Sequence, residues 1–97
     1  MTELDPEVHQ PTRLRILMLL SGVRTADFAF LLKTLGLTKG NLSAHMSRLE
    51  ELGCVRVTKQ FLGKVPNTSY CLTPRGRDRL KAYWQAMDAI RASAGRA

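Results

Sequence analysis

The sequence is poor in the features that mark secreted and membrane proteins. Only two of its 97 residues are cysteines, which is too few for a disulfide framework and favours reduced, intracellular thiols. No apolar run approaches the roughly 20 residues that a membrane-spanning helix needs. The first seven residues hold acidic side chains and no basic one, unlike a signal or transit peptide. Together these absences predict a cytoplasmic protein that does not bind a membrane.

The sequence also lacks the motifs of common enzymes. It has no glycine-rich phosphate loop, no His-Glu-x-x-His zinc motif and no Gly-x-Ser-x-Gly nucleophile elbow. Its two cysteines and two distant histidines show no recognised spacing of metal ligands. We therefore expect no catalytic residues, no metal site and no cofactor.

Acidic residues are few and unevenly placed. The chain has 8 Asp and Glu against 15 Lys and Arg, which gives a net charge of +7. Positions 52–77 contain no acidic residue, and the basic residues there are Arg56, Lys59, Lys64, Arg75 and Arg77. Such a basic stripe is typical of a phosphate-binding surface. A surface that merely keeps the protein soluble explains the stripe equally well.

The length of 97 residues and the 44% hydrophobic content predict one globular domain, residues 1–97. Its first half has the apolar spacing of three helices. The first spans residues 11–21 and is apolar almost all round, so we expect it at the centre of the core. The second begins near residue 25 or 26 and ends at Gly36, where a left-handed C-cap fits. The third begins after the capping residue Thr38, so a short turn joins the two, as in a helix-turn-helix.

The third helix, which ends at Gly53, has the most informative pattern. Its apolar residues Leu42, Met46 and Leu49 share one face. The opposite face carries small residues with a few hydrogen-bonding and basic ones, whereas a solvated face usually carries Glu, Lys and Gln. A small face suits the major groove of DNA. The predicted DNA-contacting residues of this helix and its cap are Thr38, Lys39, Gly40, Asn41, Ser43, Ala44, His45, Ser47 and Arg48. For His45, which lies between the two faces, packing is as plausible as a phosphate contact.

The second half of the chain predicts a β-hairpin followed by a long helix. Residues 54–61 alternate and are rich in β-branched side chains, residues 62–67 read as a loop, and residues 68–72 form the returning strand. Residues 74–93 form the last helix, capped by Thr73. The predicted fold class is therefore mainly α with a small β-hairpin, in the element order of a winged helix-turn-helix.

Two further patterns concern the hairpin and the last helix. Cys54 and Cys71 are symmetric about the predicted loop, so we expect them opposite each other, which leaves a thiol- or metal-responsive role as an alternative. In the last helix, apolar residues spaced by three and four form a heptad seam that either docks on the chain's own core or pairs with a second copy. The large aromatic surface favours a homodimer. The predicted interface residues are Leu80, Tyr83, Trp84, Met87 and Ile90.

Four segments in sequence order carry a family resemblance. They are His9-x-Pro11-x-Arg13-Leu14-x-Ile16-Leu17, Gly36-Leu37-Thr38-x-Gly40-Asn41-Leu42-Ser43-x-His45-Met46-x-x-Leu49-Glu50, Gly53-Cys54-Val55 and Tyr70-x-Leu72-Thr73-Pro74-x-Gly76-Arg77. Together they resemble the small stand-alone winged-helix transcriptional regulators related to the MarR and ArsR groups. The resemblance implies a dimeric DNA-binding regulator whose third helix enters the major groove and whose wing touches the DNA backbone or minor groove. This wing departs from the family because Lys64 is its one cation, where the family is usually richer in arginine.

The residues and the resemblance together predict a regulator of transcription that binds double-stranded DNA sequence-specifically as a homodimer. Outside the third helix, the predicted DNA contacts are Lys59, Lys64, Arg75 and Arg77. The alternative is a winged-helix module that binds a partner protein through the small-residue face. A protein interface lacks the salt dependence of counterion release, so binding to duplex DNA at several salt concentrations distinguishes the two. The sequence indicates no particular small-molecule effector.

Overall fold

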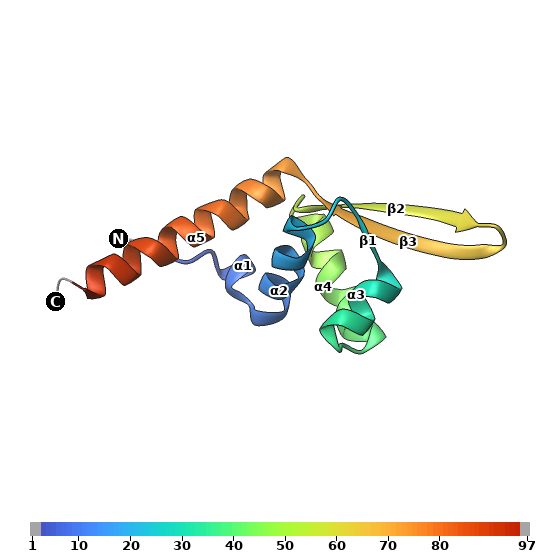
Figure 1. Cartoon of the computed structure of the whole chain (residues 1–97), viewed down its shortest axis with the longest axis horizontal. Coiled ribbons are helices and arrows are strands. Elements are labelled where there is room, and N and C mark those ends of the chain that lie inside the picture. The colour runs from blue at the N-terminus through green and yellow to red at the C-terminus, as the bar shows by residue number, and fades with distance from the viewer. Residues whose placement is uncertain (1–2, 96–97) are drawn as a thin grey trace.

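The computed structural model describes residues 3–95, so residues 1–2 and 96–97 of the predicted 1–97 domain lie outside the described part. Within it, five helices and three strands follow in the order α1 (Pro6–His9), α2 (Pro11–Ser21), β1 (Ala26–Asp27), α3 (Phe28–Leu35), α4 (Lys39–Glu51), β2 (Val55–Leu62), β3 (Val65–Leu72) and α5 (Pro74–Ala94). This is the predicted winged-helix class, mainly α with a small β-hairpin (Figure 1). No helix in the described part combines the length and the apolar character that crossing a bilayer requires.

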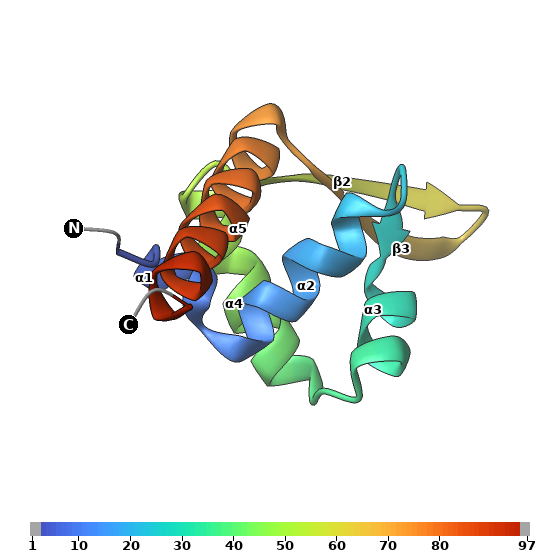
Figure 2. The same cartoon turned by 60° about the vertical axis from the view of Figure 1, so that its left-hand side comes forward.

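The helices form a body with α2 at its centre, as predicted. The β2–β3 hairpin, which is the wing, projects from one end of this body and α5 extends from the other (Figures 1 and 2). In α2, Ile16, Leu17 and Leu20 are fully buried. Met18 is exposed, so the helix has one open side despite its nearly uniform apolar sequence.

The predicted turn between α3 and α4 is confirmed by its two caps. Gly36 ends α3 with a left-handed φ of +65°, a conformation that glycine adopts without steric cost. The side-chain oxygen of Thr38 accepts a hydrogen bond from the backbone N–H of Asn41 at 3.1 Å. This bond satisfies one of the donors that the first turn of a helix leaves free. The cap therefore fixes where α4 begins.

The helix that the sequence predicts to begin near residue 25 or 26 is α3. It begins later, at Phe28, because the two residues before it form a strand. Ala26 and Asp27 are β1, which pairs antiparallel with β3 and completes a sheet of order β1-β3-β2. The Asp27 carboxylate then accepts a hydrogen bond from the N–H of Phe30 at 2.8 Å and caps α3. A two-residue strand has no periodicity to read. Its pairing with β3, distant in sequence, decides the structure here.

The wing is longer and its turn tighter than predicted. β2 reaches Leu62 and β3 starts at Val65, so the turn is Gly63-Lys64, and the prediction of a loop over residues 62–67 is wrong. Gly63 adopts a φ of +66°, which a two-residue hairpin turn needs. Pro66 lies in β3 opposite Phe61. β1 pairs β3 at Ser69 and Tyr70, well away from Pro66, and a strand edge tolerates proline.

The two cysteines do not face each other, contrary to the prediction. The hairpin register places Cys71 opposite Arg56, because the turn is centred one residue later than the cysteines require. Cys54 lies just before the ladder and is buried, and its carbonyl accepts a hydrogen bond from the N–H of Thr73 at 3.0 Å. Burial raises the pKa of the Cys54 thiol above its usual value. Cys54 therefore behaves as a small core residue.

The first turns of α5 are fixed tightly to the body. A Cβ at Gly76 would lie 2.2 Å from the backbone oxygen of Cys54, so this close approach requires glycine. Leu80 and Tyr83 follow on the same side and are buried. The Tyr83 hydroxyl lies 2.8 Å from Nδ1 of His9, which ties α5 to α1.

The predicted dimer seam is therefore divided, and its first part needs correction. Leu80 and Tyr83 belong to the core of their own chain and are not available to a second copy. Trp84, Met87 and Ile90 are 38%, 38% and 42% exposed. Heptad spacing identifies the apolar stripe but not what covers it. In α5 the first part of the apolar stripe packs into the chain's own core, and the second part continues past that core and stays exposed.

Candidate nucleic-acid interface

The α4 helix is amphipathic in the way that its sequence predicts. Leu42, Met46 and Leu49 are buried. The opposite face is exposed; over the first turns of the helix it carries Lys39, Gly40, Asn41, Ser43, Ala44 and Ser47, and its last turn carries Arg48, Glu50 and Glu51. The fold thus presents a narrow surface of small and hydrogen-bonding groups along one side of the helix.

The N-terminal turn of α4 is open to a ligand. Thr38, Lys39 and Gly40 are exposed, and a Cβ at Gly40 would meet nothing within 4 Å among the described residues. The fold therefore does not require glycine at this position. Free N–H groups and the positive end of the helix dipole favour an anion here, such as a DNA phosphate. Without a side chain at Gly40, that anion can approach the backbone closely.

A hollow between α4 and β2 joins the wing to this face. It is lined by Ser43, Met46, Ser47, Glu50, Val57, Lys59 and Tyr70. Lys59 therefore stands beside the serines of α4, although 12 residues of sequence separate it from Ser47. Burial raises the pKa of Tyr70, with a smaller contribution from the Glu50 carboxylate, so its hydroxyl stays a neutral hydrogen-bonding group. The hollow combines one cation, Lys59, and one carboxylate, Glu50, with several neutral hydrogen-bonding groups.

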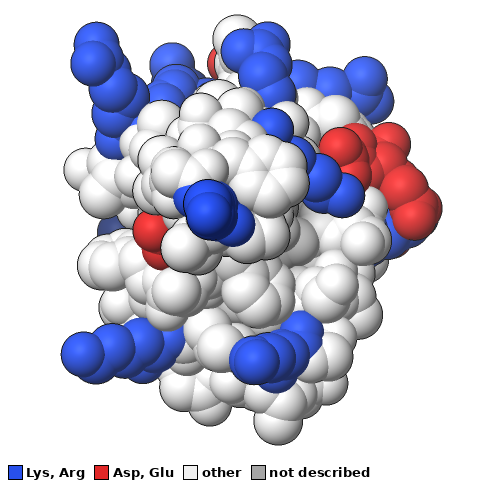
Figure 3. Space-filling view, turned by 90° about the vertical axis from the view of Figure 1, so that its right-hand side faces the viewer, with Lys and Arg blue, Asp and Glu red and all other residues white. Residues whose placement is uncertain are grey.

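The free end of the wing is largely uncharged. Phe61, Leu62 and Val65 are 70%, 58% and 64% exposed, and Lys64 occupies the turn between the strands. Viewed toward this end, the molecule shows a largely uncharged surface from which a basic side chain projects near the middle, with further Lys and Arg side chains around it, an acidic cluster at the right and smaller acidic areas elsewhere (Figure 3). The wing has few basic residues in its sequence, and in the structure its free end is correspondingly an exposed, mostly apolar surface.

Sequence similarity to known proteins decides the family. The sequence profile described as winged helix DNA-binding domain matches residues 12–91. An uncharacterized protein of Methanocaldococcus jannaschii is 38% identical over 71 residues, which are 73% of this chain and 77% of that protein. The chain belongs to the winged helix DNA-binding domain family.

Solved structures support the same assignment. A transcriptional regulator homologue from Pyrococcus horikoshii OT3 matches with a TM-score of 0.83 and 31% identity, covering 91% of this chain and 87% of that one. An ArsR family transcriptional regulator matches with a TM-score of 0.63 and 22% identity, covering 90% and 84% of the two chains, and shows the shared fold. The predicted resemblance to small winged-helix regulators is confirmed.

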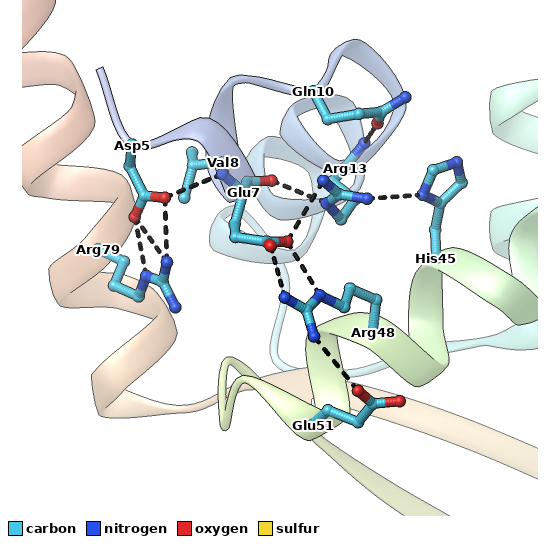
Figure 4. Close-up of polar contacts among 9 residues, drawn as sticks. All are labelled: Asp5, Glu7, Val8, Gln10, Arg13, His45, Arg48, Glu51 and Arg79. Carbon is cyan, nitrogen blue, oxygen red and sulfur yellow. Dashed lines mark hydrogen bonds and ion pairs between the residues drawn. The ribbon is translucent and has the colours of Figure 1, made fainter. Parts of the chain in front are cut away.

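In this winged helix, Arg48 of α4 is held by an acidic partner that the sequence does not reveal. Its Nη2 and Nε lie 2.5 and 3.0 Å from the two carboxylate oxygens of Glu7 in α1. Nη1 also lies 3.3 Å from Glu51 (Figure 4). The hydrogen bond from Arg48 lowers the pKa of Glu7, although desolvation opposes it, and Glu7 in turn raises the pKa of Arg48. Arg48 therefore meets DNA only by leaving or sharing Glu7.

The charge network continues from α1 to two further helices (Figure 4). Arg13 of α2 donates through Nε to the backbone oxygen of Glu7 at 2.8 Å. Arg79 of α5 forms two hydrogen bonds to the Asp5 carboxylate, at 2.9 and 3.0 Å. The four residues of α1 and their cap thus connect α2, α4 and α5. A sequence pattern cannot show pairs that are 41 and 74 residues apart.

His45 is half-buried against α2 rather than directed to solvent. Its Nδ1 lies 3.4 Å from Nη1 of Arg13. Burial, and secondly the positive charge of Arg13, lower the pKa of His45 below its usual 6.5. The ring is therefore neutral at neutral pH and lacks the charge that would attract a phosphate.

The basic residues at the start of α5 lie apart from the N-terminal turn of α4. The side chain of Arg75 packs over Gly53, with its Cδ 3.3 Å from the position of a glycine Cβ. Gly53 follows the C-terminal end of α4, so Arg75 and Arg77 are at the other end of this helix from Thr38. The structure thus brings Lys59, but not Arg75 and Arg77, to the small face of α4.

Proposed function

We propose that this winged helix is a transcriptional regulator that binds double-stranded DNA sequence-specifically, and not an enzyme. The observation that carries the proposal is the hollow in which Ser43 and Ser47 of α4 meet Lys59 of the wing. Serine hydroxyls reach base edges and a lysine reaches phosphate, so the hollow combines the two kinds of contact that sequence-specific binding needs. Asn41, two residues before Ser43 and exposed, adds a side chain of the kind that pairs with adenine in the major groove.

The proposed regulator acts as a homodimer through the distal half of α5. Trp84, Met87 and Ile90 continue the apolar stripe of Leu80 and Tyr83 past the end of the chain's own core. This part of α5 points away from the wing (Figure 1). A second copy would cover the stripe and place two recognition helices about a two-fold axis.

Selection of bound fragments from random duplex DNA, followed by titration at several salt concentrations, tests the proposal. We expect an enriched palindromic sequence and an affinity that falls as salt rises, because phosphate contacts release counterions. The absence of enrichment together with salt-independent capture of another protein would favour the alternative of a protein-binding module.

A further inference from the structure

The wing exposes large apolar side chains at the place where a DNA-binding wing needs affinity for phosphate. Phe61 is the most exposed large hydrophobic residue of the described chain at 70%. Its cross-strand neighbour is Pro66. Leu62 and Val65 next to this pair are exposed as well, and exposed apolar residues gathered at one place commonly mark an interaction site. The question is which partner covers them.

The alternation of β2 assigns the two faces of the wing. Val57 and Lys59 face the hollow beside α4, so Phe61, two residues further, lies on that same face about 7 Å beyond Lys59. Leu62 and Gln60 line a separate hollow with Phe30 of α3 and belong to the opposite face. Phe61 and Pro66 therefore extend the α4 surface outward, whereas Leu62 does not.

Charge decides between DNA and a second copy of the chain as the partner. Lys59 precedes Phe61 on the same face, Lys64 stands at the turn, and residues 52–77 contain no acidic side chain. Two wings packed together would bring like charges close. The minor groove has phosphates along both sides, and the faces of an opened base step are apolar, which matches cations beside an apolar side chain.

We infer that Phe61, with Pro66 opposite it, is an apolar wedge that enters the minor groove next to the α4 site and unstacks one base step. Phenylalanine and proline are among the side chains that act in this way in proteins that kink DNA. The inference rests on the proposed function and adds a second source of specificity. Pyrimidine–purine steps unstack most easily, so the wing would favour such a step at a position that no side chain reads directly.

Fluorescence of 2-aminopurine placed at successive steps of the selected duplex tests this wedge, because the base brightens when it is unstacked. We expect the wild-type protein to brighten one position, and Phe61→Ala to abolish that signal and weaken binding about tenfold. The matched control is Leu62→Ala, which removes a similarly exposed side chain from the opposite face. It should keep both the fluorescence signal and the binding affinity of the wild type. Because Phe61 is outside the core, thermal unfolding should be unchanged, and Phe61→Gln should behave as the alanine variant does.

Each of the following outcomes overturns the wedge, and each also shows whether the proposed DNA binding stands. If the wild-type protein binds the duplex tightly but brightens no position, the wedge is wrong and the proposed DNA binding stands. The same holds if the two alanine variants lose affinity equally, or if Phe61→Ala changes the state of association in sedimentation. If the wild-type protein binds no duplex, the proposed function and the wedge fail together.

Discussion

The guanidinium of Arg48 in the proposed recognition helix is clamped by the carboxylate of Glu7, through contacts of 2.5 and 3.0 Å. A base or phosphate would have to compete with this carboxylate for the same donors. Glu7 also places a negative charge next to the surface that we assign to DNA. The pair connects α1 and α4, and we expect it to lower the affinity of the proposed regulator for DNA.

Glu7→Gln should strengthen binding to duplex DNA of any sequence. The substitution removes a negative charge and frees Arg48, so we expect a gain of about two- to fivefold at low salt that disappears at high salt. Titration of a labelled duplex at two salt concentrations measures it. Glu51→Gln is the matched control, since it removes the weaker contact at 3.3 Å and leaves the Glu7 pair intact. A loss of affinity in Glu7→Gln would mean that the pair holds α4 in its binding position.

Asn41→Ala should weaken binding to the selected site while leaving random DNA unaffected. The side chain is exposed, and only the backbone N–H of Asn41 takes part in the cap, so folding should be unchanged. Loss of a bidentate contact to a base costs about 1–3 kcal/mol. Competition titrations with single-base variants of the site locate the position read. Gln85→Ala on α5 is the control, and equal effects of the two substitutions would contradict the assignment of α4.

Lys64→Ala should lower affinity for all sequences alike. Lys64 lies in the turn of the wing and reaches phosphate rather than base edges in our proposal. Removing one phosphate contact should reduce the slope of log affinity against log salt by about one. Lys81→Ala removes the same charge from the exposed side of α5 and should leave the slope unchanged. A loss confined to one base position would show that the turn reads sequence.

Local signals in the sequence predict the helices well, and contacts between distant residues explain what it misses. Gly36 and Thr38 act on their own neighbours, so the turn before α4 follows from the sequence. The register of the wing and the short β1 depend on pairing with β3, which no local pattern records. The same limit applies to the site. The small face of α4 is periodic and visible, whereas the Glu7 clamp on Arg48 joins residues 41 positions apart.

The lowered pKa of His45 makes stability depend on pH in a definite direction. The folded protein binds the proton at lower pH than the unfolded chain, whose histidine has a pKa of about 6.5. The unfolded state therefore carries more protons below that value, and the free energy of unfolding falls as the pH drops through this window. His45→Gln should reduce this fall. Urea unfolding of both proteins at about pH 7.5 and about pH 5.5 measures the fall in the free energy of unfolding. If the fall is the same in the wild type and in His45→Gln, other groups cause it.

The dimer prediction depends on the part of α5 that continues beyond the core. Met87→Asp combined with Ile90→Asp should give monomers, because charges cannot be buried unpaired at a helix interface. The fold should survive, since neither side chain belongs to the core. The matched control is Gln85→Asp with Ala89→Asp, which adds the same charge to the other side of the same helix turns. Sedimentation should show dimers for the wild type and the control, and monomers for the first variant.

Loss of the dimer should also remove most of the affinity for the selected site. Two recognition helices related by a two-fold axis read half-sites about one helical turn, or 34 Å, apart. A monomer contacts one half-site, so its binding should become insensitive to the second half-site and to the spacing between them. A wild-type protein that sediments as a monomer at micromolar concentration and selects a non-palindromic sequence would refute this arrangement. In that case Trp84, Met87 and Ile90 would need a different partner.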